Sequence, residues 1–153
     1  MSLFFRTLSR STVALLLSAS MVWASTNLSP EIPDGQQTPG SLCSTKDKDY
    51  SGVRYGERIP YCRRNVSTET KVAIYEQYGI EASRRKHYTI DHFIPLSIGG
   101  SNKPENLWPE HKKIKALRQN LEMDVYQDLQ EGVITQEQAL STIREAKLHP
   151  PLH

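Results

Sequence analysis

Four residues whose types suit phosphodiester hydrolysis occur within one 22-residue stretch, residues 90–111. They are Asp91, His92, Asn106 and His111. Cleaving a phosphodiester requires a hard cation on a phosphate oxygen and a neutral imidazole that deprotonates the attacking water. Asp91 and His92 can divide those two tasks. The types and spacing therefore predict a one-metal hydrolytic site.

A predicted strand leads into this pair, because residues 87–90 favour β-structure. Neighbouring side chains on a strand point to opposite faces, so Asp91 and His92 can converge on one phosphate only where the strand ends or bulges. Pro95 marks such an end. A reversal at Gly99-Gly100 then returns the chain to Asn106, whose side chain is expected to hydrogen-bond backbone across the loop. Asn106 would orient the site without transferring a proton.

The order Asp-His, Pro-Leu, Gly-Gly and Asn-Leu-Trp-Pro resembles the HNH, or ββα-metal, endonuclease motif over about 22 residues. The chain from about Gly40 onward is similar to small exported bacterial proteins of that superfamily. The resemblance implies a small α+β domain with a ββα unit and additional helices. It also implies that Asp91 is a metal ligand, His92 the general base and Asn106 the residue that fixes the loop.

The last metal ligand of the family lies near or on the following helix, and we assign this role to His111. His111 follows Asn106 by five residues, which is closer than is usual, and the usual offset falls near Lys115. Asn120 and the adjacent Glu110 are alternatives. Mg²⁺ suits a carboxylate ligand best, while a histidine ligand also admits Zn²⁺, Mn²⁺ or Ni²⁺.

His87 lies five residues before His92, so a role in phosphate or metal binding is an alternative to our prediction of a plain surface histidine. The chain has no Cys-x-x-Cys pair, which argues against a structural zinc knuckle.

Three helices are expected. Ser67 can cap the first, which runs to about Tyr78 before Gly79. The second is one continuous amphipathic helix from His111 to Gly132. The third covers residues 136–147, with a capping box made by Thr135 and Gln138. Its apolar positions 140 and 143 are expected to turn inward.

Residues 1–24 are predicted to be a secretory signal peptide, because two arginines precede a short apolar run and small residues end it. Residues 25–40 contain proline and glycine without apolar periodicity and predict a flexible lead, followed by the nuclease domain at residues 41–149. The protein is therefore expected to be secreted or periplasmic, with no membrane attachment after cleavage, and monomeric.

Cys43 and Cys62 are the only cysteines. Export to an oxidising compartment favours a disulfide between them. A crosslink that closes a loop of this length stabilises the folded protein by about 3 kcal/mol, because it restricts the unfolded chain. Two thiolate metal ligands are the alternative.

Without residues 1–24 the chain has 17 basic and 17 acidic residues, so net charge gives no support for nucleic-acid binding. Charge is nevertheless segregated, since residues 54–86 hold eight Lys and Arg against four Glu. The residues predicted to bind nucleic acid are Arg63, Arg64, Arg84, Arg85, Lys86, Lys112 and Lys113.

The leading hypothesis is an exported, metal-dependent endonuclease for DNA or RNA with little sequence specificity. The alternative is a catalytically silent exported module that binds nucleic acid or an acidic protein. A third possibility, a toxin acting on another cell, would need an immunity partner or a delivery route.

Overall fold

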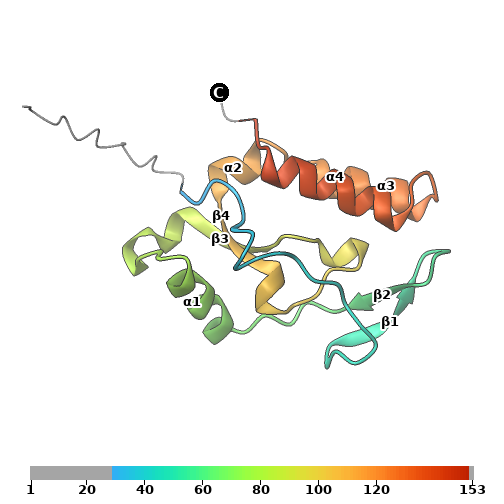
Figure 1. The fold of residues 1–153 in the computed structure, drawn as a ribbon, viewed down its shortest axis with the longest axis horizontal. Coiled ribbons are helices and arrows are strands. Elements are labelled where there is room, and N and C mark those ends of the chain that lie inside the picture. The colour runs from blue at the N-terminus through green and yellow to red at the C-terminus, as the bar shows by residue number, and fades with distance from the viewer. Residues whose placement is uncertain (1–28, 152–153) are drawn as a thin grey trace, which may run out of the picture.

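The computed structural model describes residues 29–151, which form an α+β fold with two separate two-stranded antiparallel sheets (Figure 1). One sheet pairs β1 (Tyr50–Arg54) with β2 (Ile59–Cys62), and the other pairs β3 (Tyr88–His92) with β4 (Leu107–His111). The α-helices are α1 (Thr68–Gln77), α2 (Lys112–Ala116), α3 (Leu121–Gln130) and α4 (Gln136–Leu148). Short 3₁₀ helices cover Ala82–His87, Leu96–Ile98 and Pro104–Asn106. The predicted α+β class is confirmed.

The β3–β4 hairpin lies between α1 on one side and the antiparallel pair of α3 and α4 on the other (Figure 1). Its register is regular, and Asp91 faces Trp108 while His92 faces Leu107. Ile90 and Leu107 pack with Ile74 of α1 in a small apolar cluster. Since side chains alternate along a strand, Asp91 points to the opposite side, toward α4.

The larger apolar cluster lies between the β3–β4 loop and the two C-terminal helices. It contains Ile59, Ile94, Ile98, Val125, Leu129, Ala139 and Ile143. Helix α4 begins with the predicted capping box of Thr135 and Gln138, and α1 begins with the predicted cap at Ser67. Ile143 is buried and Leu140 packs against this cluster, so the inward face predicted for α4 is confirmed.

The single helix predicted after His111 is wrong, because the chain forms α2 and α3 with a turn between them. Within the turn, the Leu117 amide donates to the Ile114 carbonyl at 3.1 Å, a tighter pattern than that of an α-helix. Leu117 is 51% exposed, so it contributes little burial that would keep the helix continuous. The neighbouring Lys115 and Arg118 instead extend to carboxylates on the hairpin.

The lead predicted to be flexible is held against the domain from Ser29 onward, where the carbonyl accepts from the Tyr88 hydroxyl at 2.5 Å. The Thr38 hydroxyl, which is buried, donates to the Leu107 carbonyl at 2.9 Å. The Asp34 amide donates to the Tyr78 hydroxyl at 3.0 Å. These contacts are with residues far along the chain, which a local composition cannot predict. The proposed signal segment and residues 25–28 lie outside the described residues.

The predicted disulfide between Cys43 and Cys62 is confirmed. The segment that contains Cys43 is hydrogen-bonded to the β3–β4 loop. The Ser101 amide donates to the Ser41 carbonyl at 3.0 Å, and the Cys43 amide donates to the Gly99 carbonyl at 2.8 Å. The disulfide therefore joins the β1–β2 sheet to a segment that pairs with the β3–β4 loop. None of the helices in residues 29–151 is long and apolar enough to cross a membrane.

Candidate functional site

His92 is the last residue of β3 and its side chain is almost fully buried. Its Nε2 lies 3.0 Å from Asn102 Oδ1. The other end of that amide is fixed, because Asn102 Nδ2 donates to the Asp49 carboxylate and, at 2.7 Å, to the Arg63 carbonyl. Asn102 Oδ1 must therefore act as acceptor. The neutral imidazole carries its proton on Nε2 and keeps the lone pair on Nδ1.

Nδ1 of His92 is buried and has no hydrogen-bond partner among the described residues. The pKa of His92 is lowered, mainly by burial and further by the charge of Arg64, although Asn102 and Asp91 act in the opposite direction. The imidazole is therefore neutral at pH 7. A neutral ring with a free lone pair is the form that a general base requires.

Asn106 is fully buried and makes the cross-loop hydrogen bonds expected from the sequence. Its Oδ1 accepts from the Ile94 amide at 2.9 Å, and its Nδ2 donates to the Ile94 and Ser101 carbonyls at 2.9 and 2.8 Å. In addition, the Phe93 amide donates to the Asn106 carbonyl at 2.8 Å. Asn106 thus fixes both ends of the loop directly after His92.

Asp91 belongs to a different environment. Lys115 Nζ lies 2.9 Å from its Oδ1, and Lys147 Nζ lies 3.4 Å from its Oδ2. Burial alone would raise the pKa of Asp91, but Lys147, a hydrogen bond with Glu110 and Lys115 together hold it well below its usual value. The carboxylate is ionised and already neutralised by two ammonium groups.

Glu110 of β4 is fully buried beside Asp91 and forms an ion pair with Arg118. Burial and the adjacent charge of Asp91 raise the pKa of Glu110 to about 7, although Arg118 and Lys147 oppose this. Lys147 also donates to Glu122 at 2.7 Å. One buried network of charges thus connects the hairpin with α2, α3 and α4.

Lys147 and Asn102 were not recognised from the sequence as site residues. Lys147 had a detectable signal, because it follows Ala139 and Ile143 at intervals of four and so lies on the buried face of α4. Nothing local distinguished Asn102, whose partners Asp49 and Arg63 are distant in the sequence.

The fold does not bring the side chain of His111 close to that of Asp91. His111 pairs with Tyr88 across the hairpin, three positions from Asp91, so the two side chains point to opposite faces and lie roughly 10 Å apart along the strand. Its ring contacts the Tyr88 ring edge-on with centroids 4.9 Å apart and stacks with the His87 ring at 6.3 Å. Its Nδ1 accepts from the Lys113 amide at 3.1 Å, so it caps α2.

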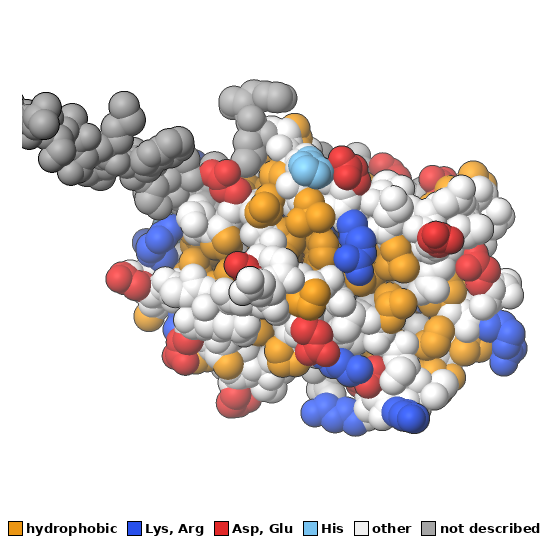
Figure 2. All heavy atoms as spheres, in the orientation of Figure 1, with side chains coloured by type: hydrophobic (Ala, Val, Ile, Leu, Met, Phe, Trp, Pro, Cys, Tyr) orange, Lys and Arg blue, Asp and Glu red, His pale blue; other side chains and the backbone are white. Residues whose placement is uncertain are grey.

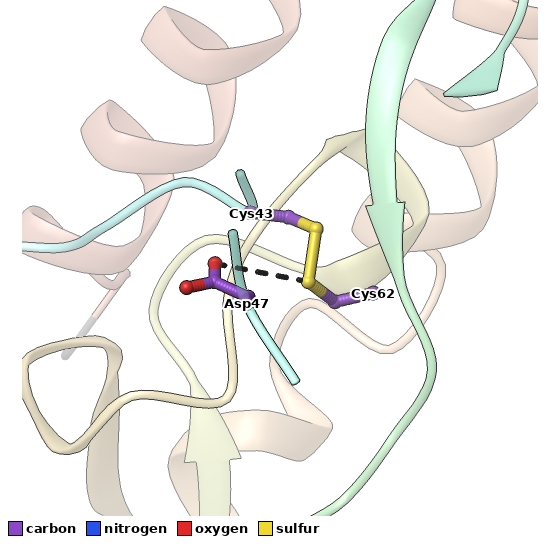
Figure 3. Close-up of side chains that lie close together, drawn as sticks. All are labelled: Cys43, Asp47 and Cys62. Carbon is purple, nitrogen blue, oxygen red and sulfur yellow. Dashed lines mark hydrogen bonds between the residues drawn. A yellow bond between two sulfur atoms is a disulfide. The ribbon is translucent and has the colours of Figure 1, made fainter. Parts of the chain in front are cut away.

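The predicted metal ligands Asp91 and His111 therefore do not fit a shared cation in this structure. In the described part of the chain, one group of three His, Cys, Asp or Glu residues has ligand atoms within 4.8 Å of one another, namely Cys43, Asp47 and Cys62. Figure 3 shows that the two sulfurs are joined in the disulfide, with Asp47 Oδ2 3.9 Å from Cys62 Sγ. Disulfide sulfurs are not thiolates, so this group does not fit a metal ion either.

The predicted nucleic-acid-binding residues fall into two groups. Arg63 and Arg64 follow β2 on the His92 side of the hairpin. The remaining residues, Arg84, Arg85, Lys86, Lys112 and Lys113, lie at the His111 end. There, Arg84 donates to the Tyr88 hydroxyl at 2.8 Å, and Arg85 pairs with Glu76 at 3.5 Å. On the face shown in Figure 2, basic and acidic side chains are interspersed.

Comparison of the chain with protein-family models, with curated proteins and with solved structures finds no match. The resemblance to the HNH motif therefore rests on the residues of the chain alone.

Proposed function

We propose that the protein is an exported endonuclease that hydrolyses phosphodiester bonds of DNA or RNA, with His92 as general base. The observation that carries this proposal is the geometry of the imidazole. Asn102 accepts from Nε2 and leaves the lone pair of Nδ1 unpaired, while burial and Arg64 keep the ring neutral. A buried nitrogen without a partner costs about 1–3 kcal/mol, and a functional role is one reason for a protein to retain it.

In the proposed reaction, Nδ1 of His92 takes a proton from water while the water oxygen bonds to phosphorus. The bond from phosphorus to the leaving sugar oxygen then breaks. That oxygen takes a proton from solvent water, and His92 returns its proton to solvent, so the products are a phosphomonoester and an alcohol. Because Nδ1 is covered, the proposal requires a local opening that admits water and phosphate to this nitrogen.

A cation on Asp91 and His111 is no part of this scheme, because the two side chains lie on opposite faces of the hairpin. Metal dependence stays a prediction from the sequence, and the activity assay tests it directly.

The assay incubates the oxidised protein with fluorescently labelled DNA and RNA under Mg²⁺, Mn²⁺, Zn²⁺ or EDTA. His92→Ala is expected to lose about 100-fold or more in cleavage rate, the usual contribution of a general base. His87→Ala is the matched control, since His87 is an exposed histidine outside the proposed site. Cleavage unchanged in His92→Ala would refute the role of His92.

A second candidate function is the catalytically silent module that binds nucleic acid. Two observations favour it, namely the neutralisation of Asp91 by Lys115 and Lys147 and the burial of Nδ1. Binding of nucleic acid without cleavage under every metal, by protein shown to be folded, would select this candidate.

A further inference from the structure

We propose that a single strand of nucleic acid binds in a basic groove beside His92, formed by residues 47–51, 63–65, 70 and 102–104. We propose that it does not bind at the basic group around His111, which comprises Arg84, Arg85, Lys86, Lys112 and Lys113. The inference deepens the proposed function and rests on it only for the identity of the cutting residue. Nucleic-acid binding in this groove is a separate property, which can be measured without cleavage.

Two cavities make up the groove. The first has a volume of about 310 Å³, and Asn102, Lys103 and Thr70 are among its lining residues. The second has a volume of about 450 Å³ and is lined by Tyr50, Arg63 and Arg64, among others. Lys48, Asp49 and Asn65 line both cavities, so the two are adjacent on this surface.

The groove lies on the Nε2 side of the His92 ring, although His92 itself lines neither cavity. Asn102, which lines the first cavity, holds the imidazole of His92 at 3.0 Å. Arg64, which lines the second, is close enough for its charge to lower the pKa of His92. A phosphate in the groove would therefore lie next to Asn102, which orients His92.

The charge of the groove suits a polyanion. Its cations are Lys48, Arg63, Arg64 and Lys103, and its acids are Asp47 and Asp49. Both acids have partners in the protein, since Asp47 pairs with Lys103 at 3.1 Å and Asp49 accepts from Asn102. Lys48 and Arg64 are exposed, and no hydrogen bond or ion pair within the described chain engages either side chain. These two cations are available to phosphates.

The occupant is a single strand because an aromatic ring accompanies the cations. Tyr50, which is partly exposed, lines the second cavity together with Arg63 and Arg64. Stacking on such a ring needs an unpaired base, and this contact is typical of proteins that bind single strands.

The basic group around His111 is a poorer candidate for the same role. It lies at the opposite end of the hairpin, about four residue positions or roughly 13 Å from His92. Several of its side chains already make internal contacts. Arg84 bonds to Tyr88, Arg85 pairs with Glu76, and Lys112 donates to the Lys86 carbonyl at 2.8 Å.

The test measures fluorescence anisotropy of a labelled single-stranded oligonucleotide of about 12 nucleotides, a length within the usual site size. The oxidised protein carries His92→Ala, and the buffer contains EDTA, so that no strand is cut. Adding Lys48→Gln and Arg64→Gln should make the negative slope of log affinity against log salt shallower by about 1.4. At ~0.1 M salt this change corresponds to a loss of affinity of about 25-fold. Circular dichroism checks that each variant folds.

Arg58→Gln is the matched control for lost charge, because Arg58 is exposed at the far turn of the β1–β2 hairpin and lines neither cavity. The affinity of the Arg58→Gln variant should equal that of the His92→Ala protein into which the change is introduced. Lys112→Gln with Lys113→Gln tests the competing surface. The proposal would be overturned if the Lys112 and Lys113 variant lost more affinity than the groove variant, or if the groove variant kept the salt slope of the parent. Tighter binding of duplex than of single strand, or no binding at all, would also overturn it.

The outcomes separate this inference from the proposed function. Groove-dependent binding by a protein that never cuts would support the groove and refute the nuclease. Cleavage that needs His92 but is unaffected by the groove substitutions would support the nuclease and refute the groove.

Discussion

The imidazole of His92 illustrates how neighbouring polar groups fix a protonation state. Asp49 and the Arg63 carbonyl occupy the donor end of the Asn102 side chain, so its oxygen faces Nε2. Asn102 is therefore a positioning residue that selects which nitrogen is basic. The proton is placed on Nε2, and the lone pair remains on Nδ1.

The tautomer can be measured by long-range ¹H–¹⁵N correlation spectra at pH 7, which are expected to show the proton of His92 on Nε2. In Asn102→Ala this preference should disappear, because no acceptor remains at Nε2. Asn120→Ala, which alters an exposed asparagine, is the control and should leave the His92 signals unchanged. A proton on Nδ1 in the unaltered protein would contradict the assignment.

Glu110 should make stability depend on pH. Its pKa is raised to about 7 by burial and by Asp91, above the value near 4.5 of an ordinary glutamate. Between these values the folded protein keeps a proton that the unfolded chain releases, so rising pH lowers the free energy of unfolding by at most about 1.4 kcal/mol per unit.

Glu110→Gln isolates this effect, because the other titrating groups are common to both proteins. Denaturant unfolding at several pH values from 4.5 to 8 should show the stability of the original protein falling relative to Glu110→Gln as pH rises to about 7. Parallel curves for the two proteins would show that Glu110 titrates normally.

At the scale of elements, the loop between β3 and β4 holds His92 in place. A Cβ on Gly100 would overlap the Ile94 carbonyl and lie 2.9 Å from the Pro95 carbonyl oxygen. The backbone of this turn therefore passes too close to itself for any side chain. The Asn106 side chain hydrogen-bonds the Ile94 amide and carbonyl and the Ser101 carbonyl of this loop.

Gly100→Ala is expected to reduce the free energy of unfolding by about 3 kcal/mol or more, because backbone and not a flexible side chain must move. Gly35→Ala is the control, since an added Cβ there has nothing within 4 Å. Denaturant unfolding compares the two variants. Equal stabilities would mean that the turn adapts to a side chain.

Elements with local signals were predictable from the sequence. Ser67 accepts from the Thr70 amide and starts α1, and Thr135 and Gln138 start α4, as predicted. The division between α2 and α3 was not predictable. At this point of the chain Lys115 and Arg118 reach acids of the hairpin, and apolar spacing does not report such contacts.

At the scale of the whole molecule, Lys147 connects the C-terminal helix to the hairpin. Its Nζ donates to the His92 carbonyl at 2.7 Å and also contacts Asp91 and Glu122. The sequence indicated Asp91 and His92 as a pair at the end of a strand. It did not indicate that their partners would come from α4 and from the loop, because those contacts form only when the complete domain folds.

Lys147→Met should therefore destabilise the whole domain by about 3–5 kcal/mol, the usual cost of leaving one partner of a buried ion pair behind. Glu145→Gln on the same helix is the control, since Glu145 is exposed, and its effect should stay within about 0.5 kcal/mol. Thermal and denaturant unfolding measure both. An undiminished stability in Lys147→Met would mean that Asp91 does not depend on α4.

The most direct test of the proposed function is the rate of nucleic-acid cleavage between pH 4.5 and 8 for the original protein and His92→Ala. Because the pKa of His92 is lowered, the rate of the original protein should rise with pH, with its midpoint below the ordinary histidine value of about 6.5. His92→Ala should lose both the activity and this rise. A folded original protein that cuts neither DNA nor RNA at any pH and under any metal would contradict the proposal.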